Sequence, residues 1–231
     1  MITSSAALKK LRVAGIAAVA ALCVAGCLCG CTVNVSTSSV TSSSSTASKI
    51  VSQSNSFDNA ISSITVNLRA GDVSIVKGDA LTVTCDFPEE YAPKVTCDAN
   101  GLTVNQEISG DANIQMGGAW TVTITVPDSC AIQTVTTDLD LGNFSMTGFD
   151  FTKLDVDADL GDITLTDCTI HEVNLENDMG NIKATGSTIE TGKIDVDLGD
   201  IKLDGTFGAS LETECSVGGI TVNGKEQQSN D

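Results

Sequence analysis

The stretch DVDADLGDITL (Asp155 to Leu165) decides the fold, because near-copies of it return at a fixed interval. The copies are TTDLDLGNFSM, NLENDMGNIKA and KIDVDLGDIKL, which begin at Thr136, Asn174 and Lys193. A constant period near 20 residues is typical of a solenoid, in which each repeat is one coil stacked on the previous one. The glycines that mark the repeat are each 19 residues apart: Gly142, Gly161, Gly180, Gly199 and Gly218.

Within each repeat, apolar and polar residues alternate as they do in β-strands. Counted from the glycine, the apolar residues lie at odd offsets before it and at even offsets after it. A straight strand keeps one parity, so the chain must turn a corner at the glycine. We therefore predict an all-β fold, a β-solenoid with 19-residue coils over about 135–222. The predicted inward columns include the residue before each glycine (Leu141, Leu160, Met179, Leu198, Val217) and the residue two positions after it (Phe144, Ile163, Ile182, Ile201, Ile220).

The segment that precedes the repeats is also rich in alternating stretches, and we expect antiparallel strands or irregular coils over 58–129. Within it, AGDVSIV (Ala70 to Val76) carries the same Gly-Asp-aliphatic corner as the repeats. An end coil exposes unpaired strand edges, so a cap is expected at the start of the stack. The predicted all-β domain covers 57–224, and the polar segment 225–231 is expected to be a disordered tail.

The first 31 residues have the features of a signal peptide. Three basic residues precede the apolar stretch 13–26, which is short for a membrane span. Val24-Ala25-Gly26-Cys27 resembles a lipobox, so we predict lipidation of Cys27, with Cys31 as the alternative. An uncleaved membrane anchor is the other interpretation. Both predict a membrane-attached protein on the extracytoplasmic face of a bacterial cell, with 32–56 as a Ser/Thr-rich flexible linker.

The chain is strongly acidic, with a formal net charge of −18. Three of its 12 basic residues lie in the first 12 residues, so 9 basic residues accompany 30 acidic ones in the remainder. Such a surface repels nucleic acid and favours a basic protein surface as partner, with a glycan as another candidate. Two outward columns are expected to be a solvated face or a calcium site: Asp138, Asp140, Asp157, Asp159, Glu176, Asp178, Asp195 and Asp197.

Five cysteines lie beyond the targeting segment. If the chain forms a hairpin about Tyr91, Cys85 and Cys97 fall opposite each other and a disulfide is geometrically allowed; two buried thiols are the alternative. Cys130 and Cys168 occupy the same column two coils apart, which is too far for a disulfide. These two and Cys215 are expected to fill the core.

Enzyme chemistry has little support in the sequence. Asp157 and Asp159 are the candidate pair for acid–base work, by analogy with β-helical polysaccharide-active enzymes. The repeats contain no Arg, and His171 is the only His in the chain, so no His-based nucleophile set exists. We predict a protein that is not an enzyme and expect no cofactor other than calcium.

The order of three features resembles the bacterial putative-adhesin family: RAGDVSIVKGDALTVT from Arg69, VTITVP from Val122, and the serial LGDI turns. The resemblance covers about 58–222. It implies an all-β solenoid with a cell-surface role and brings no catalytic residues. The expected function is a non-enzymatic, lipid-anchored surface module that acts as an adhesin or as a structural or binding protein of the envelope. An envelope-stress regulatory accessory is the alternative, and a polysaccharide-active enzyme is the remote one.

Overall fold

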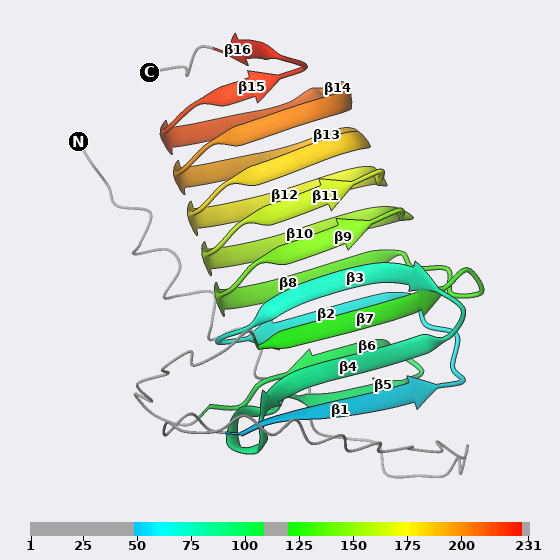
Figure 1. Ribbon diagram of the computed structural model, residues 1–231. Coiled ribbons are helices and arrows are strands. Elements are labelled where there is room, and N and C mark those ends of the chain that lie inside the picture. The colour runs from blue at the N-terminus through cyan, green and yellow to red at the C-terminus, as the bar shows by residue number, and fades with distance from the viewer. Residues whose placement is uncertain (1–48, 109–119, 228–231) are drawn as a thin grey trace. The chain divides into compact units, whose positions relative to one another are not determined.

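In the computed structural model, residues 49–108 and 120–227 are described, and their strands form one 16-stranded sheet that winds into a stack of coils (Figure 1). The predicted lipobox, and the linker as far as residue 48, lie outside the described residues. No helix within the described residues is long and apolar enough to cross a membrane. The predicted β-solenoid is confirmed.

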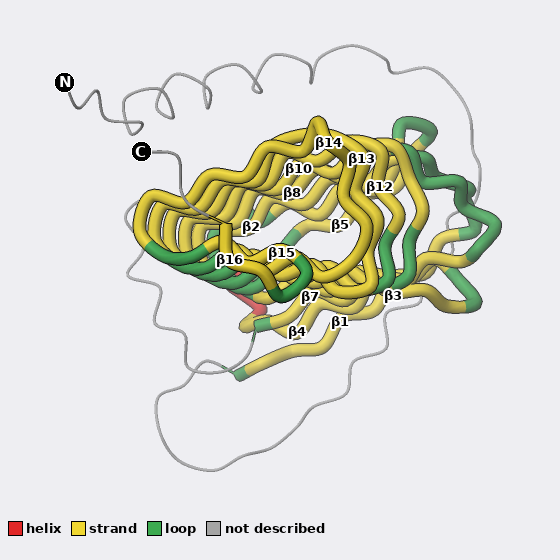
Figure 2. Tube along the Cα trace, turned by 90° about the horizontal axis from the view of Figure 1, so that it is seen from above, coloured by secondary structure: helices red, strands yellow, loops and turns green. Residues whose placement is uncertain are grey.

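The regular coils pair in parallel with a shift of one repeat, so that Ile163 lies beside both Phe144 and Ile182. Strands before each glycine corner form a first wall, and strands after it form a second wall (Figure 2). Strand β13 runs through both walls, as does β14. The strands are β8 (Thr134–Leu141), β9 (Phe144–Thr147), β10 (Asp150–Leu160), β11 (Ile163–Thr166), β12 (Thr169–Met179), β13 (Ile182–Leu198), β14 (Ile201–Val217) and β15 (Ile220–Val222).

Two further coils lie below the repeats. Strands β2 (Ser63–Leu68) and β3 (Asp72–Gly78) pair in parallel with β8 and β9, so the predicted corner at Gly71 begins the stack of regular corners. Strands β6 (Gly101–Asn105) and β7 (Thr121–Pro127) pair in parallel with β2 and β3 and make the coil beneath. After forming the lower coil with β6 and β7, the chain therefore continues with β8 and β9 on the other side of β2 and β3.

Antiparallel strands close the lower end, as predicted. Strand β4 (Leu81–Pro88) pairs with β7, and β5 (Lys94–Asp98) pairs with β6; the one-turn helix η1 (Glu89–Tyr91) separates β4 from β5. Strand β1 (Ile50–Phe57) pairs with β4. The predicted flexible linker is therefore wrong over 50–56, because pairing with β4 satisfies the backbone of a segment whose composition alone would not order it.

At the upper end, β16 (Lys225–Gln227) folds back antiparallel on β15. A tight turn at Asn223 and Gly224, both with positive φ, makes this return. The predicted disordered tail is wrong for 225–227, and residues 228–231 lie outside the described residues. The hairpin covers part of the edge that the last coil would otherwise expose.

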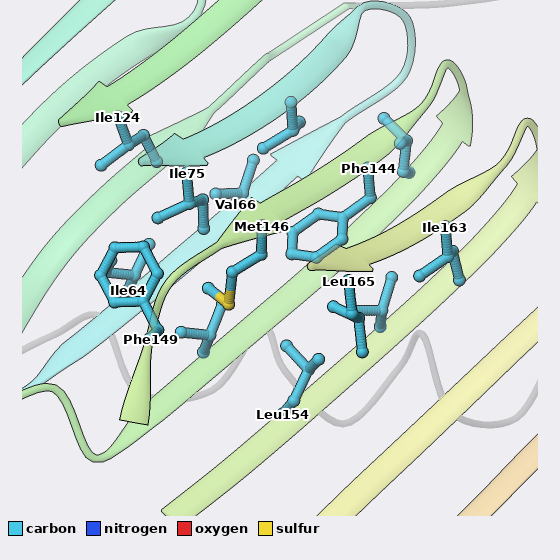
Figure 3. Packing of buried hydrophobic residues seen from close by; sticks show 14 of the residues in the cluster. Ile64, Val66, Ile75, Ile124, Phe144, Met146, Phe149, Leu154, Ile163 and Leu165 are labelled. Carbon is cyan, nitrogen blue, oxygen red and sulfur yellow. The ribbon is translucent and has the colours of Figure 1, made fainter. Parts of the chain in front are cut away.

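The core consists of aliphatic ladders that run through the stack (Figure 3). The column two positions after the glycine is buried as predicted, from Phe144 to Ile220. The column nine positions after it, which includes Phe151, Ile170 and Ile189, is buried as well. Cys130 and Cys168 are both buried in the core, where they were expected. Stacking of like residues in register buries each side chain against its counterparts above and below.

One predicted column is wrong. The residue directly before each glycine was expected to face inward, yet Leu160, Met179, Leu198 and Val217 are 44%, 49%, 44% and 61% exposed. The reason lies in where the corner begins. Inward alternation stops at Ala158, and the next two residues, Asp159 and Leu160, are both exposed, which a straight half-buried strand does not permit. The bend therefore starts before the glycine and places these side chains outside it.

Candidate functional site

The outer edge of the glycine corners, together with the adjoining outer face of the first wall, is the candidate site, and we call it the corner face. The corners follow one another up the left edge of the stack in Figure 1. Their glycines cannot be replaced without strain. Gly161 has a φ of +140°, and a Cβ there would lie 1.8 Å from the carbonyl oxygen of Gly142. The coils approach each other so closely here that only glycine fits.

A ladder of alternating aspartate and asparagine follows the glycines. Asp162 Oδ1 accepts hydrogen bonds from the backbone N–H and the Nδ2–H of Asn181, at 2.7 and 3.0 Å. Asn181 Oδ1 in turn accepts from the backbone N–H of Asp200 at 3.0 Å. The same pattern links Asp72 to Asn143 and Asn143 to Asp162. Each side chain satisfies a backbone donor of the next corner, so the ladder fixes the shape of this edge.

An apolar ladder lies immediately on the other side of the glycines: Leu160, Met179, Leu198 and Val217, with the half-buried Leu141 below them. We call these five residues the apolar ladder. Their backbones are held in the sheet, since the Leu160 carbonyl accepts from the N–H of Gly142 at 2.8 Å and the Met179 carbonyl accepts from that of Gly161 at 3.0 Å. A rigid backbone therefore presents apolar side chains to solvent. The alternation of apolar and polar residues could not reveal that these side chains are exposed, because it assigns their positions to the core.

The predicted acidic columns flank the apolar ladder on the first wall. Asp138, Asp159 and Asp197 are exposed, and Asp140, Asp157, Glu176, Asp178 and Asp195 are half-buried. Several carboxylates of the face have basic partners: Asp140 lies 3.2 Å from Arg69 Nε, while Lys193 Nζ lies 3.0 Å from Asp195 and 2.7 Å from Glu214. Among the residues described, no group of three or more potential ligands is placed to hold a metal ion.

Ion pairs between neighbouring coils shift the pKa values of the side chains that form them. Lys153 Nζ lies 2.8 Å from Glu172 on the next coil; this hydrogen bond raises the pKa of Lys153 and lowers the pKa of Glu172. The hydrogen bond from Lys193 to Glu214 raises the pKa of Lys193 in the same way. These pairs offset part of the repulsion between stacked acids, although each is exposed enough for salt to screen it.

Two hollows, of about 510 and 470 Å³, lie near the lower and upper ends of the described stack. Asp157 and Asp159, the candidate acid–base pair, line neither of them. His171 is exposed, and its Nδ1 lies 2.5 Å from Glu190 on the next coil. The upper hollow adjoins the corner face through Asp200 and Gly218.

The predicted hairpin that would join Cys85 to Cys97 is wrong. Cys85 lies on β4 beside Gln53 and Val122, whereas Cys97 lies on β5 beside Leu102. The two strands do not pair with each other, and both residues carry thiols, so a disulfide between them stays a prediction. Burial raises the pKa of the Cys85 thiol to about 12. This cysteine fills the core and is poorly suited to nucleophilic chemistry.

This chain matches one family model and is similar in fold to solved structures. The family model described as Toastrack DUF4097 matches residues 61–230. A putative cell adhesion protein from Clostridium sporogenes is 15% identical over 75% of this chain and 99% of its own, with a TM-score of 0.50. A putative adhesin from Bacteroides fragilis is 17% identical over 75% and 97%, with a TM-score of 0.43. No curated protein matches. At such identities a structural likeness shows the fold alone.

Proposed function

The chain belongs to the Toastrack DUF4097 family, and we propose that it is a non-enzymatic binding module of the adhesin kind, displayed on the outer side of the cell membrane. The apolar ladder carries the proposal. A soluble solenoid has no structural need to expose four large apolar side chains in one continuous line, and contiguous exposed apolar surface marks sites of interaction.

Two observations support a binding role over catalysis. The carboxylates of the corner face recur from coil to coil along the stack, and Arg69 and Lys193 beside them are engaged in ion pairs. The name of the similar structure from Clostridium sporogenes, a putative cell adhesion protein, agrees with such a role. A repeated flat face suits recognition of an extended partner, since every coil offers the same groups.

Attachment to the membrane rests on the lipobox that ends at Cys27. A diacylglycerol on this cysteine supplies two acyl chains, which hold a protein far more firmly than one. The 22 residues between Cys27 and β1 span at most about 75 Å when fully extended. A tether of that reach would leave the faces of the solenoid accessible to partners.

Membrane fractionation of cells that express the full chain tests the attachment. We expect the wild type in the membrane fraction, with a mass that corresponds to cleavage before Cys27 and addition of lipid. The variant Cys27→Ala should remain an unprocessed precursor or enter the medium. The double variant Cys27→Ala/Cys31→Ala controls for use of the second cysteine. Unaltered processing and retention of the double variant would contradict lipid anchoring.

A further inference from the structure

We propose that the apolar ladder and the acids beside it bind a cationic amphipathic helix that lies along the stack. The inference rests on the proposed function and specifies the partner of the same face. Three features of the described structure carry it: the exposure of the ladder, the spacing of its rungs, and the sign of the charge on both sides of it.

The spacing favours a helix. The side chains of the ladder come from neighbouring strands in register, as Leu160 beside Met179 and Met179 beside Leu198, so they recur about every 4.8 Å. An α-helix presents one apolar anchor per turn of about 5.4 Å, whereas an extended strand presents one about every 6.7 Å on each face. The mismatch per rung is about 0.6 Å for a helix and about 1.9 Å for a strand. A helix of about 13 residues therefore matches the whole ladder, which spans about 19 Å.

The charges favour a basic partner. Asp159, Asp178 and Asp197 lie one position before the ladder residues, and Asp162 and Asp200 lie two positions after them, across the glycines. A helix with an apolar stripe and Lys or Arg on both sides of it would pair with both rows. A second copy of this chain would place like charges opposite each other, and an anionic membrane would be repelled for the same reason.

The backbone is ready for such a contact. Hydrogen bonds between coils hold the ladder carbonyls, and the Asp/Asn ladder fixes the turn on the other side of each glycine, including Asn181 on Asp162. Binding would thus order few groups of the solenoid, which lowers its entropic cost. The upper hollow is lined by Gly218 and Glu226 and thus begins directly after the last rung, Val217.

The test uses the full chain in nanodiscs of zwitterionic lipid and a labelled 18-residue peptide of Leu and Lys, with Leu at helical spacing. Fluorescence anisotropy measures binding against empty nanodiscs. We expect saturable binding that weakens with salt, and helix formation by the bound peptide in circular dichroism. A peptide of the same composition with its Leu positions scrambled should bind at least about tenfold more weakly. Equal binding of both peptides would assign the attraction to net charge and overturn the proposal.

Variants locate the contact. Leu160→Ser/Leu198→Ser should weaken binding by at least about tenfold, and Met179→Lys should do so through a single exposed position. Removing the flanking charges in Asp159→Asn/Asp178→Asn/Asp197→Asn should weaken it more than a matched removal of distant exposed acids in Asp79→Asn/Asp150→Asn/Asp204→Asn. Thermal unfolding confirms that each variant is folded. Unchanged affinity in folded ladder variants would overturn the proposal.

The two proposals fail separately. If the amphipathic peptide does not bind while the full chain still binds cells or glycans, this partner class is wrong and the surface-binding function stands. If the full chain is retained inside the cell, the proposed function fails whatever the peptide does.

Discussion

Asn181 donates both its backbone N–H and its side-chain Nδ2–H to one oxygen, Oδ1 of Asp162 on the coil below, at 2.7 and 3.0 Å. The repeat thus alternates Asp and Asn at a position where identical residues would have been the simplest choice. Two carboxylates one coil apart would repel by roughly 1 kcal/mol in water-like surroundings. The alternation removes that repulsion and adds a hydrogen bond.

Replacing the middle member of this ladder should destabilise the fold. In Asn181→Asp the Nδ2 donor is lost, and a third carboxylate stands between Asp162 and Asp200. We expect a loss of about 1–3 kcal/mol in the free energy of unfolding, measured by chemical denaturation at low salt. High salt should recover the electrostatic part only. Asp162→Asn is the matched control and should change stability little, because the amide oxygen still accepts. Equal effects of the two variants would contradict this account.

The stacked glycines should not tolerate even one added methyl group. In Gly161→Ala the new Cβ meets the Gly142 carbonyl oxygen in a backbone conformation, φ +140°, that L-residues rarely adopt. We expect a loss of about 3 kcal/mol or more, seen as a lower melting temperature. Gly219→Ala is the control, because its Cβ would meet only Asp200 Oδ1, at 3.5 Å. Similar melting temperatures for both variants would show that the corners relax easily.

Calcium should act on the acidic columns as a general screening ion. The described residues offer no group of three or more potential ligands for a metal ion, and Asp195 and Asp140 have basic partners. We expect calcium chloride to raise the melting temperature no more than magnesium chloride at the same concentration. A rise specific to calcium, abolished by Asp157→Asn/Asp159→Asn/Asp178→Asn, would instead establish the calcium site that the sequence suggested.

The thiol of Cys85 should resist alkylation. Burial raises its pKa to about 12, so at pH 8 almost none of it is the reactive thiolate. Mass spectrometry of the native protein should show Cys85 unmodified, whereas denaturation without reductant should expose both Cys85 and Cys97 to labelling. Resistance of the pair to labelling in denaturant, relieved by reductant, would restore the disulfide.

The same raised pKa gives a dependence of stability on pH. The folded state holds the proton of Cys85 more tightly than the unfolded state, whose thiol pKa is about 8.5. The contribution of Cys85 is therefore complete below about pH 8.5 and declines as the pH rises toward 12. Cys85→Ala should remove this alkaline component, at the cost of a small cavity, and its stability should fall less steeply between pH 8.5 and 11.

The sequence by itself determined the repeat and most of the core. The 19-residue spacing of glycines such as Gly161 and Gly180 sets the register, because each coil must pair with the one below it. The period-two pattern identified the ladder around Ile163, since only one face of a half-buried strand packs against the core. The corner at Gly71 could be recognised from the local phrase alone, and the structure stacks it directly under Gly142.

Only the tertiary structure decided what lies far apart in sequence or at the bends. Strand β1 forms because β4 supplies its hydrogen bonds, although its own residues are mostly polar. Cys85 and Cys97 belong to different parts of the sheet because their strands pair with β1 and β7 and with β6, and not with each other. Leu160 is exposed because the bend begins one step before the glycine. A periodic pattern records which face of a strand is buried, but it does not record where that strand begins to turn.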